Sequence, residues 1–246
     1  MKPKYISSDK IFYHLDKVNK WKQSGDFSPI TTEIHLSNVC NNNCFYCSMD
    51  KVKDTKIMNL EESDHAISFA KNIGSKALIF SGGGEPTISP YFADVLVYSK
   101  SLGMENGVIT NGVAVSGIVA DSILKCATWV RFSLDACDTE TYSKIRGTDS
   151  FNKVVDNISS FLKRKDETKS KITVGLQIVV NKYNYKRVHE ITRWMNKTFP
   201  AADYIQVRPI ETRINEDVYS LDELNEIAPQ LKLIKSNKKV IVSDKW

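Results

Sequence analysis

The chain has 246 residues, of which 41% are hydrophobic and 26% charged, the composition of an ordinary soluble globular domain. Its net charge of +5 is small, and lysines alternate with acidic residues, so no nucleic-acid partner is implied. No window approaches the ~18 consecutive apolar residues of a membrane span, and the N-terminus has no signal-peptide pattern, so we expect a cytoplasmic protein without membrane contact.

The first predicted element is an amphipathic helix over residues 8–23, which we expect to end near Gly25 and to cover an end of the fold. From residue 31 onward, short β-rich runs alternate with amphipathic segments. The predicted strands are residues 32–36, 77–81, 107–110, 128–134, 172–180 and 204–207. The predicted helices are residues 60–73, 91–102, 117–126, 151–163 and 185–196. Asn59 and Glu62 form a capping pair for the first of these, which we expect to end at Gly74.

This alternation predicts an α/β fold with parallel strands and right-handed crossovers. Periodicity alone leaves open whether the sheet closes partly into a barrel or stays doubly wound. In either case reactive groups lie at the carboxyl ends of the strands. A helix near residues 221–231 and a short apolar run at 240–242 are expected to form a cap. The predicted division is a helical extension at 1–30, a core at 31–210 and a C-terminal cap at 211–246.

A cysteine-rich segment, CNNNCFYC at residues 40–47, follows the first predicted strand. The odd total of five cysteines favours a metal site in a reducing compartment over a disulfide framework. Cys40, Cys44 and Cys47 have spacings at which thiolates wrap a cubane iron–sulfur cluster, and three ligands leave one iron open for catalysis. The alternatives are unrelated buried cysteines or a zinc site, for which His35 is a conceivable further ligand.

Further motifs lie at the ends of later predicted strands. SGGGEP at residues 81–86 has three glycines that let backbone approach a ligand, although such a run is as often only a turn. Glu85 in this motif can accept a hydrogen bond from a cationic amine. TNG at 110–112 and SLD at 133–135 end the next two strands, where short polar residues are often turn formers.

In this order, the motifs resemble those of the radical S-adenosylmethionine superfamily: CxxxCxYC, GGE, TNG and SLD. The resemblance covers residues 31–210 and implies a partial (β/α)6 TIM-like barrel with an N-terminal helix and a short C-terminal cap. It is closest to the branch with the SPASM or twitch extension and the molybdopterin-precursor cyclase. Many of those enzymes carry auxiliary clusters on C-terminal cysteines. Here no cysteine follows Cys137, so we expect a single 4Fe-4S cluster.

The resemblance also implies roles for individual residues. Cys40, Cys44 and Cys47 would bind the cluster. The residues implied to contact S-adenosylmethionine are Tyr46, Gly83, Gly84, Glu85, Pro86, Thr110, Asn111, Ser133, Asp135, Arg146, Val180 and Gln206. Among these, Glu85 would hold the methionine amino group and Arg146 its carboxylate. The alternative for Arg146 is a solvated helix end, and strand residues such as Val180 are core residues more often than cofactor contacts.

The implied activity is reductive cleavage of S-adenosylmethionine to a 5'-deoxyadenosyl radical, which abstracts hydrogen from a peptide side chain or a small metabolite. A flavodoxin or ferredoxin-type reductant is the implied partner. A non-catalytic iron–sulfur or zinc-binding module is the alternative function. Cys137, just after the SLD motif, is a candidate hydrogen donor, although a small loop residue is the simpler interpretation. Cys126 is interpreted as a buried helix cysteine.

Overall fold

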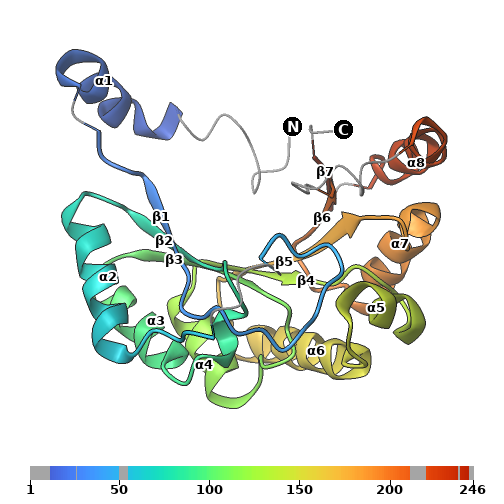
Figure 1. The fold of residues 1–246 in the computed structure, drawn as a ribbon, viewed down its shortest axis with the longest axis horizontal. Coiled ribbons are helices and arrows are strands. Elements are labelled where there is room, and N and C mark those ends of the chain that lie inside the picture. The colour runs from blue at the N-terminus through green and yellow to red at the C-terminus, as the bar shows by residue number, and fades with distance from the viewer. Residues whose placement is uncertain (1–11, 26, 50–54, 211–219, 238, 244–246) are drawn as a thin grey trace.

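In a computed structural model of the chain, the structure describes residues 12–25, 27–49, 55–210, 220–237 and 239–243. A curved sheet of seven parallel strands forms its centre, with strands in chain order from β1 to β7 (Figure 1). The strands are β1 (Thr31–Ile34), β2 (Ala77–Phe80), β3 (Glu105–Thr110), β4 (Trp129–Ser133), β5 (Thr173–Val180), β6 (Tyr204–Pro209) and β7 (Val240–Val242). The order never reverses, as it would in a doubly wound sheet, so the predicted parallel α/β partial barrel is confirmed.

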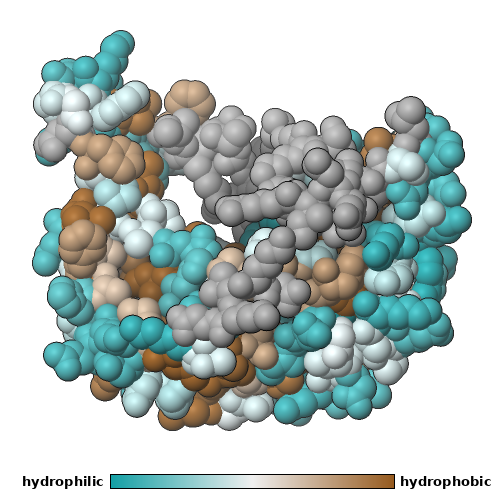
Figure 2. Space-filling model, viewed as in Figure 1, coloured by the Kyte–Doolittle hydropathy of each residue, from teal (hydrophilic) through white to brown (hydrophobic). Residues whose placement is uncertain are grey.

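The helices are α1 (Leu15–Ser24), α2 (Leu60–Asn72), α3 (Phe92–Ser101), α4 (Gly117–Cys126), α5 (Thr139–Arg146), α6 (Phe151–Glu167), α7 (Val188–Thr198) and α8 (Leu221–Ile234), with short 3-10 turns η2 (Pro86–Ile88) and η3 (Tyr185–Arg187). Helices α2 to α7 cover the convex face of the sheet, and none of the described helices lies on its concave face (Figure 1). Seen from outside, the helical layer is mainly hydrophilic, with hydrophobic patches between (Figure 2).

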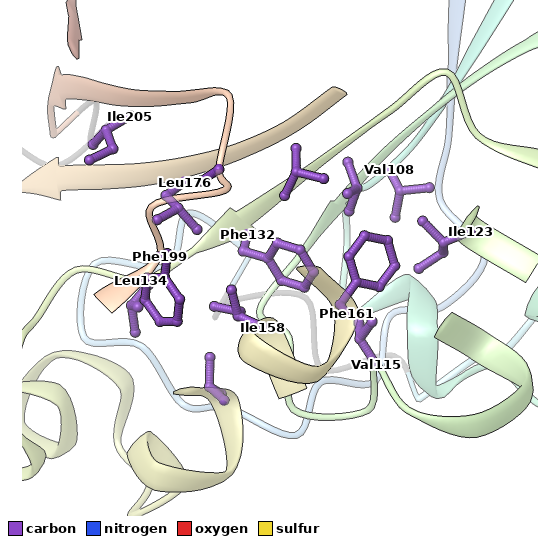
Figure 3. Close-up of a cluster of buried hydrophobic side chains, with 14 of the residues drawn as sticks. Val108, Val115, Ile123, Phe132, Leu134, Ile158, Phe161, Leu176, Phe199 and Ile205 are labelled. Atoms are coloured by element: carbon purple, nitrogen blue, oxygen red, sulfur yellow. The ribbon is translucent and has the colours of Figure 1, made fainter. Parts of the chain in front are cut away.

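The hydrophobic core lies between the convex face of the sheet and these helices (Figure 3). Alternate strand residues point into it, because successive side chains of a strand face opposite sides. Phe132 on β4 meets Phe161 on α6 edge to face, with ring centroids 5.6 Å apart, and both rings are fully buried. Each such ring contributes about 1.5–3 kcal/mol of burial free energy, which holds α6 against the strands.

The capping prediction for α2 is confirmed. The Asn59 side chain accepts from the Glu62 backbone N–H at 2.8 Å, and the Glu62 side chain accepts from the Asn59 N–H at 2.9 Å. Gly74 follows the end of the helix with a φ of 91°, a left-handed conformation that favours glycine. The sequence therefore specifies both ends of this helix.

Two elements differ from expectation. Residues 240–242, expected within a cap, form β7, a seventh strand that pairs parallel to β6. Three apolar residues are too short a pattern to reveal a strand, and only pairing with β6 identifies it. Helix α5 was not predicted, although Asp138 caps its first turn and Gly147 ends it in the left-handed conformation.

Helix α1 ends before Gly25 as predicted; it begins at Leu15, and the predicted start at residue 8 lies outside the described residues. None of its residues is buried, so the expectation that it covers an end of the fold is wrong for the part that the structure describes. It lies beyond the β1 end of the sheet (Figure 1). Among the described residues, no helix combines the length and apolar character needed to cross a membrane.

Candidate cluster and cofactor site

The three cysteines of the predicted cluster motif lie on the loop after β1 and line one cavity of about 450 Å³. Cys40 and Cys47 are exposed and Cys44 is half-buried. Within the described part of the chain, no three metal-ligating side chains converge on one ion position. A cubane cluster does not require such convergence, because each thiolate binds a different iron. The donor set and its shared cavity therefore fit a 4Fe-4S cluster.

One side of the cysteine loop packs against the glycine motif after β2. The Gly84 N–H donates to the Ser37 carbonyl at 2.6 Å, and the Glu85 N–H donates to the Val39 carbonyl at 2.9 Å. A Cβ atom on Gly84 would lie 2.0 Å from the Val39 carbonyl oxygen, where no side chain fits. Glycine is thus required here for the contact between two loops, in addition to any approach to a cofactor.

The other side of the cysteine loop is bonded to the end of α5. The Asn43 N–H donates to the Arg146 carbonyl at 2.8 Å, and the Phe45 N–H donates to the Ile145 carbonyl at 3.2 Å. These carbonyls are free for the loop because the last carbonyls of a helix have no intrahelical partner. The loop that carries the thiols is therefore held between two segments far apart in the sequence.

Glu85 connects the ends of β2 and β3 and is buried. Its Oε1 accepts from the hydroxyls of Thr87 and Thr110 at 2.5 and 2.7 Å and from the Thr87 N–H at 3.1 Å. Its Oε2 accepts from the Asn111 N–H at 2.7 Å. Burial raises the pKa of Glu85, and these hydrogen bonds oppose the shift. Oε2 therefore keeps capacity to accept from a further donor, such as an amine.

A buried charge pair supports the third side of the cavity. Arg146 Nη2 lies 2.7 Å from Asp135 Oδ2, although it is not aligned for a hydrogen bond, and the Tyr46 hydroxyl donates to the same oxygen at 2.6 Å. Arg146 Nη1 also lies 3.6 Å from Cys44 Sγ. Burial raises the pKa of the Cys44 thiol, and the charge of Arg146 opposes this. Arg146 is a buried member of this network, so the alternative of a solvated helix end is wrong.

The structure brings together most of the predicted cofactor residues. Those that line the cavity with the three cysteines are Tyr46, Gly84, Glu85, Thr110, Asn111, Ser133 and Arg146. Gly83, Pro86 and Asp135 lie in the same motifs but do not line the cavity as it is described, and Gln206 lines a neighbouring cavity.

Val180 is fully buried in the core, and its neighbour Val179 lines the cavity instead. A one-residue offset along a strand moves the side chain to the other face, which explains the difference for Val180.

Cys137 is not brought to the cavity. Its Sγ lies 3.4 Å from Arg187 Nη2 and 3.8 Å from Glu190 Oε1, on the side of α7 and η3. Burial raises the pKa of its thiol to about 11. This placement gives the hydrogen-donor hypothesis no support. Cys126 is buried on α4, as predicted.

Several residues that line the cavity were missed in the sequence. Arg131, Gln177 and Arg208 line the same cavity as the cysteines. The signal for Arg131 is its position two residues before Ser133, because residues at i and i+2 of a strand share a face. Because Arg131 is on the same face of the strand as Ser133, a predicted cofactor residue, it could have been predicted to line the cavity.

Comparison with known proteins identifies the family. A family model described as the Radical SAM superfamily matches residues 34–195. A probable GTP 3',8-cyclase of Saccharolobus islandicus is 28% identical over 213 residues, covering 84% of this chain and 66% of that protein. Another, of Pyrococcus abyssi, is 26% identical over 182 residues, covering 73% of this chain and 57% of that protein.

Solved structures show the same fold. Streptococcus suis SuiB bound to S-adenosylmethionine has a TM-score of 0.73 at 17% identity, covering 97% of this chain and 57% of that chain. The enzyme anSMEcpe with bound AdoMet and the Kp18Cys peptide has a TM-score of 0.66 at 18% identity, covering 86% of this chain and 63% of that chain.

The chain spans slightly less than two thirds, 66%, of the length of the first of these curated relatives. The family model nevertheless matches well over half of the chain, including all three cluster cysteines and the ends of β2 to β4. The cofactor prediction agrees with this family, which uses a 4Fe-4S cluster and S-adenosylmethionine. The chain belongs to the radical SAM superfamily.

Proposed function

We propose that this chain is an enzyme that cleaves S-adenosylmethionine reductively and passes the resulting radical to a substrate. One observation carries the proposal: three cysteine thiols and residues of the GGE, TNG and SLD motifs line a single cavity. When bound, the cluster and S-adenosylmethionine supply one-electron cleavage of a carbon–sulfur bond. Residues 31–210 supply the site in this proposal, flanked by segments 1–30 and 211–246.

In this scheme the chain's own residues bind the cofactor and hold the cysteine loop in position. Glu85 Oε2 accepts from the methionine amino group, since it is the carboxylate oxygen with a single described donor. Ser133 lines the cavity opposite and offers its hydroxyl. Arg146, Asp135 and Tyr46 keep the cysteine loop in position, because their buried network reaches from Cys44 to the end of β4. The protein's contribution is therefore placement of the reactants.

We further propose that the substrate is a small metabolite. The sequence relatives are named for a reaction of GTP, whereas the neighbours crystallised with peptides resemble this chain at 16–18% identity, which supports only the fold. A flavodoxin or ferredoxin-type reductant suits the chain's net charge of +5. A cytoplasmic location suits thiols that must stay reduced to bind iron.

The test is anaerobic reconstitution with iron and sulfide, followed by dithionite and S-adenosylmethionine. We expect about four irons per chain and formation of 5'-deoxyadenosine, measured by mass spectrometry. Zinc without iron, and no 5'-deoxyadenosine, would instead establish the metal-binding module.

A further inference from the structure

A fixed arginine, Arg131, lies in the concave interior of the sheet and lines the cluster cavity. Arg131 points inward from β4, and its guanidinium lies 5.8 Å from the centroid of the Trp129 ring. Its Nη1 donates to Gln206 Oε1 at 2.8 Å. The Trp129 ring lies across β3 at Gly107, where a Cβ would come within 2.2 Å of the ring. Because Gly107 has no side chain, the Trp129 ring can lie against it and contact the Arg131 guanidinium.

A second glycine, Gly175, leaves room for Tyr204 to reach Arg131. Gly175 on β5 pairs with both Arg131 and Tyr204, and a Cβ at Gly175 would lie 2.2 Å from Tyr204 Cζ. Tyr204 crosses β5 at this glycine and hydrogen-bonds to Arg131. The guanidinium is thus held by an aromatic ring, an amide and a phenol, none of which carries a counter-charge. The Nε of Arg131 is buried and has no hydrogen-bond partner within the described part of the chain.

A second arginine faces the same space. Arg208 on β6 lines the same cavity as Arg131, and its buried Nε also lacks a partner among the residues that the structure describes. Burial lowers the pKa of Arg131, and the charge of Arg208 lowers it as well. Arg208 lies two residues beyond Gln206, or about 7 Å along the strand. The two guanidinium groups can therefore contact one anion from two positions along the strand direction.

Two acidic residues line the same cavity, Glu33 on β1 and Glu85 after β2, on the side away from β6. Glu33 lies near Arg131 and also accepts hydrogen bonds from Ser81 and from His35, the latter at 3.3 Å. Glu85 receives four hydrogen bonds at the ends of β2 and β3. Gln177, 6% exposed and lining the cavity, has an Oε1 without a partner. Among the described residues, the β4 to β6 side of the cavity thus presents unused donors, one unused acceptor and two arginines without a carboxylate.

We propose that Arg131 and Arg208 form a subsite that binds a carboxylate or phosphate group of a small anionic substrate. The inference rests on the proposed function, because it takes the cysteine end of the cavity as the place of reaction. Guanidinium groups suit both anions, since their N–H donors match paired oxygens. The subsite would direct the rest of the substrate toward the carboxyl ends of the strands.

The experiment titrates inorganic phosphate and, separately, malonate into the anaerobically reconstituted full chain by calorimetry. Ionic strength is held constant and S-adenosylmethionine is saturating, so that its own carboxylate is already bound. We expect at least one of the two anions to bind. Arg131→Gln and Arg208→Gln should each raise the dissociation constant of that anion at least about tenfold. The preferred anion distinguishes a phosphate substrate from a carboxylate one.

Arg187→Gln is the matched control, because this arginine pairs with Asp138 and Glu190 through contacts of 2.7 and 2.6 Å. It should leave anion affinity unchanged. Arg131→Lys keeps the charge and should retain part of the affinity, and circular dichroism identifies any variant that fails to fold. If neither anion binds, or if both glutamine variants bind as the wild type does, the subsite is wrong.

Loss of S-adenosylmethionine affinity in these variants, together with competition between phosphate and the cofactor, would assign the arginines to the cofactor and also overturn the inference. The same samples are assayed for 5'-deoxyadenosine. Failure to form it contradicts the proposed function, whereas its formation without arginine-dependent anion binding contradicts the subsite alone. The two failures are therefore distinguishable.

Discussion

The two faces of the sheet differ in composition, and β4 shows the difference within three residues. Phe132 points to the convex face and packs against Phe161, whereas Arg131 and Ser133 point to the concave face and line the cavity. The convex face is apolar and covered by helices (Figures 1 and 3). The concave face carries the charged and polar side chains. Stability and chemistry therefore reside on opposite sides of the same strands, and substitutions should separate them.

The largest expected effect is on the cysteine loop. Cys44→Ala removes one of the three proposed thiolate ligands, so we expect loss of the cluster and no detectable 5'-deoxyadenosine, while the circular dichroism spectrum stays unchanged. Iron content and product formation are the measurements. Cys137→Ala is the control and should keep both, because Cys137 contacts Arg187 outside the cavity. A Cys44→Ala protein with full iron and turnover would refute the cluster assignment.

On the convex face we expect a loss of stability without loss of the cluster. Phe161→Ala removes a ring that is 1% exposed and should lower the free energy of unfolding by about 3–5 kcal/mol, measured by urea denaturation. At a temperature where the variant is folded, it should still bind iron. Phe69→Ala, at a ring that is 59% exposed, should change stability by no more than about 0.5 kcal/mol. Equal effects of the two would contradict the assignment of the core.

An intermediate effect is expected where the cysteine loop meets the glycine motif. Gly84→Ala places a methyl group against the Val39 carbonyl, so we expect a loss of about 1–3 kcal/mol together with reduced iron incorporation. Gly103→Ala has open space around its Cβ and a φ of 74°, and should cost about 1–2 kcal/mol without loss of iron. Iron retention in Gly84→Ala would show that the loop tolerates displacement.

The smallest effect is expected far from both the cavity and the hydrophobic core. Asn59→Ala removes the N-cap of α2 and should cost about 1 kcal/mol with iron content unchanged. Ser150, at the equivalent position of α6, makes no capping hydrogen bond with its side chain, so Ser150→Ala should be nearly neutral. A difference near zero between the two variants would mean that the cap is not stabilising.

Local patterns were sufficient for much of the fold. The bounds of α4 were predicted to the residue from its apolar spacing. Those of α2 were predicted to within one residue, because Asn59 and Glu62 cap its start and Gly74 follows its end. The three cysteines and the motif ends were also found, since each is a short contiguous signal. Helix α5 was missed although its caps are visible, because it is short and carries a weak apolar pattern.

The sequence by itself determined the alternation of strands and helices, the spacing of the three cysteines and the order of the motifs, because each depends on residues close in the chain. Only the tertiary structure decided that β7 joins the sheet, that Val179 rather than Val180 lines the cavity, and that Arg146 pairs with Asp135. Register and sheet curvature set these relations, and both depend on residues far apart in sequence. The same is true of Arg131 and Arg208, which share a cavity only because β4 and β6 both border β5.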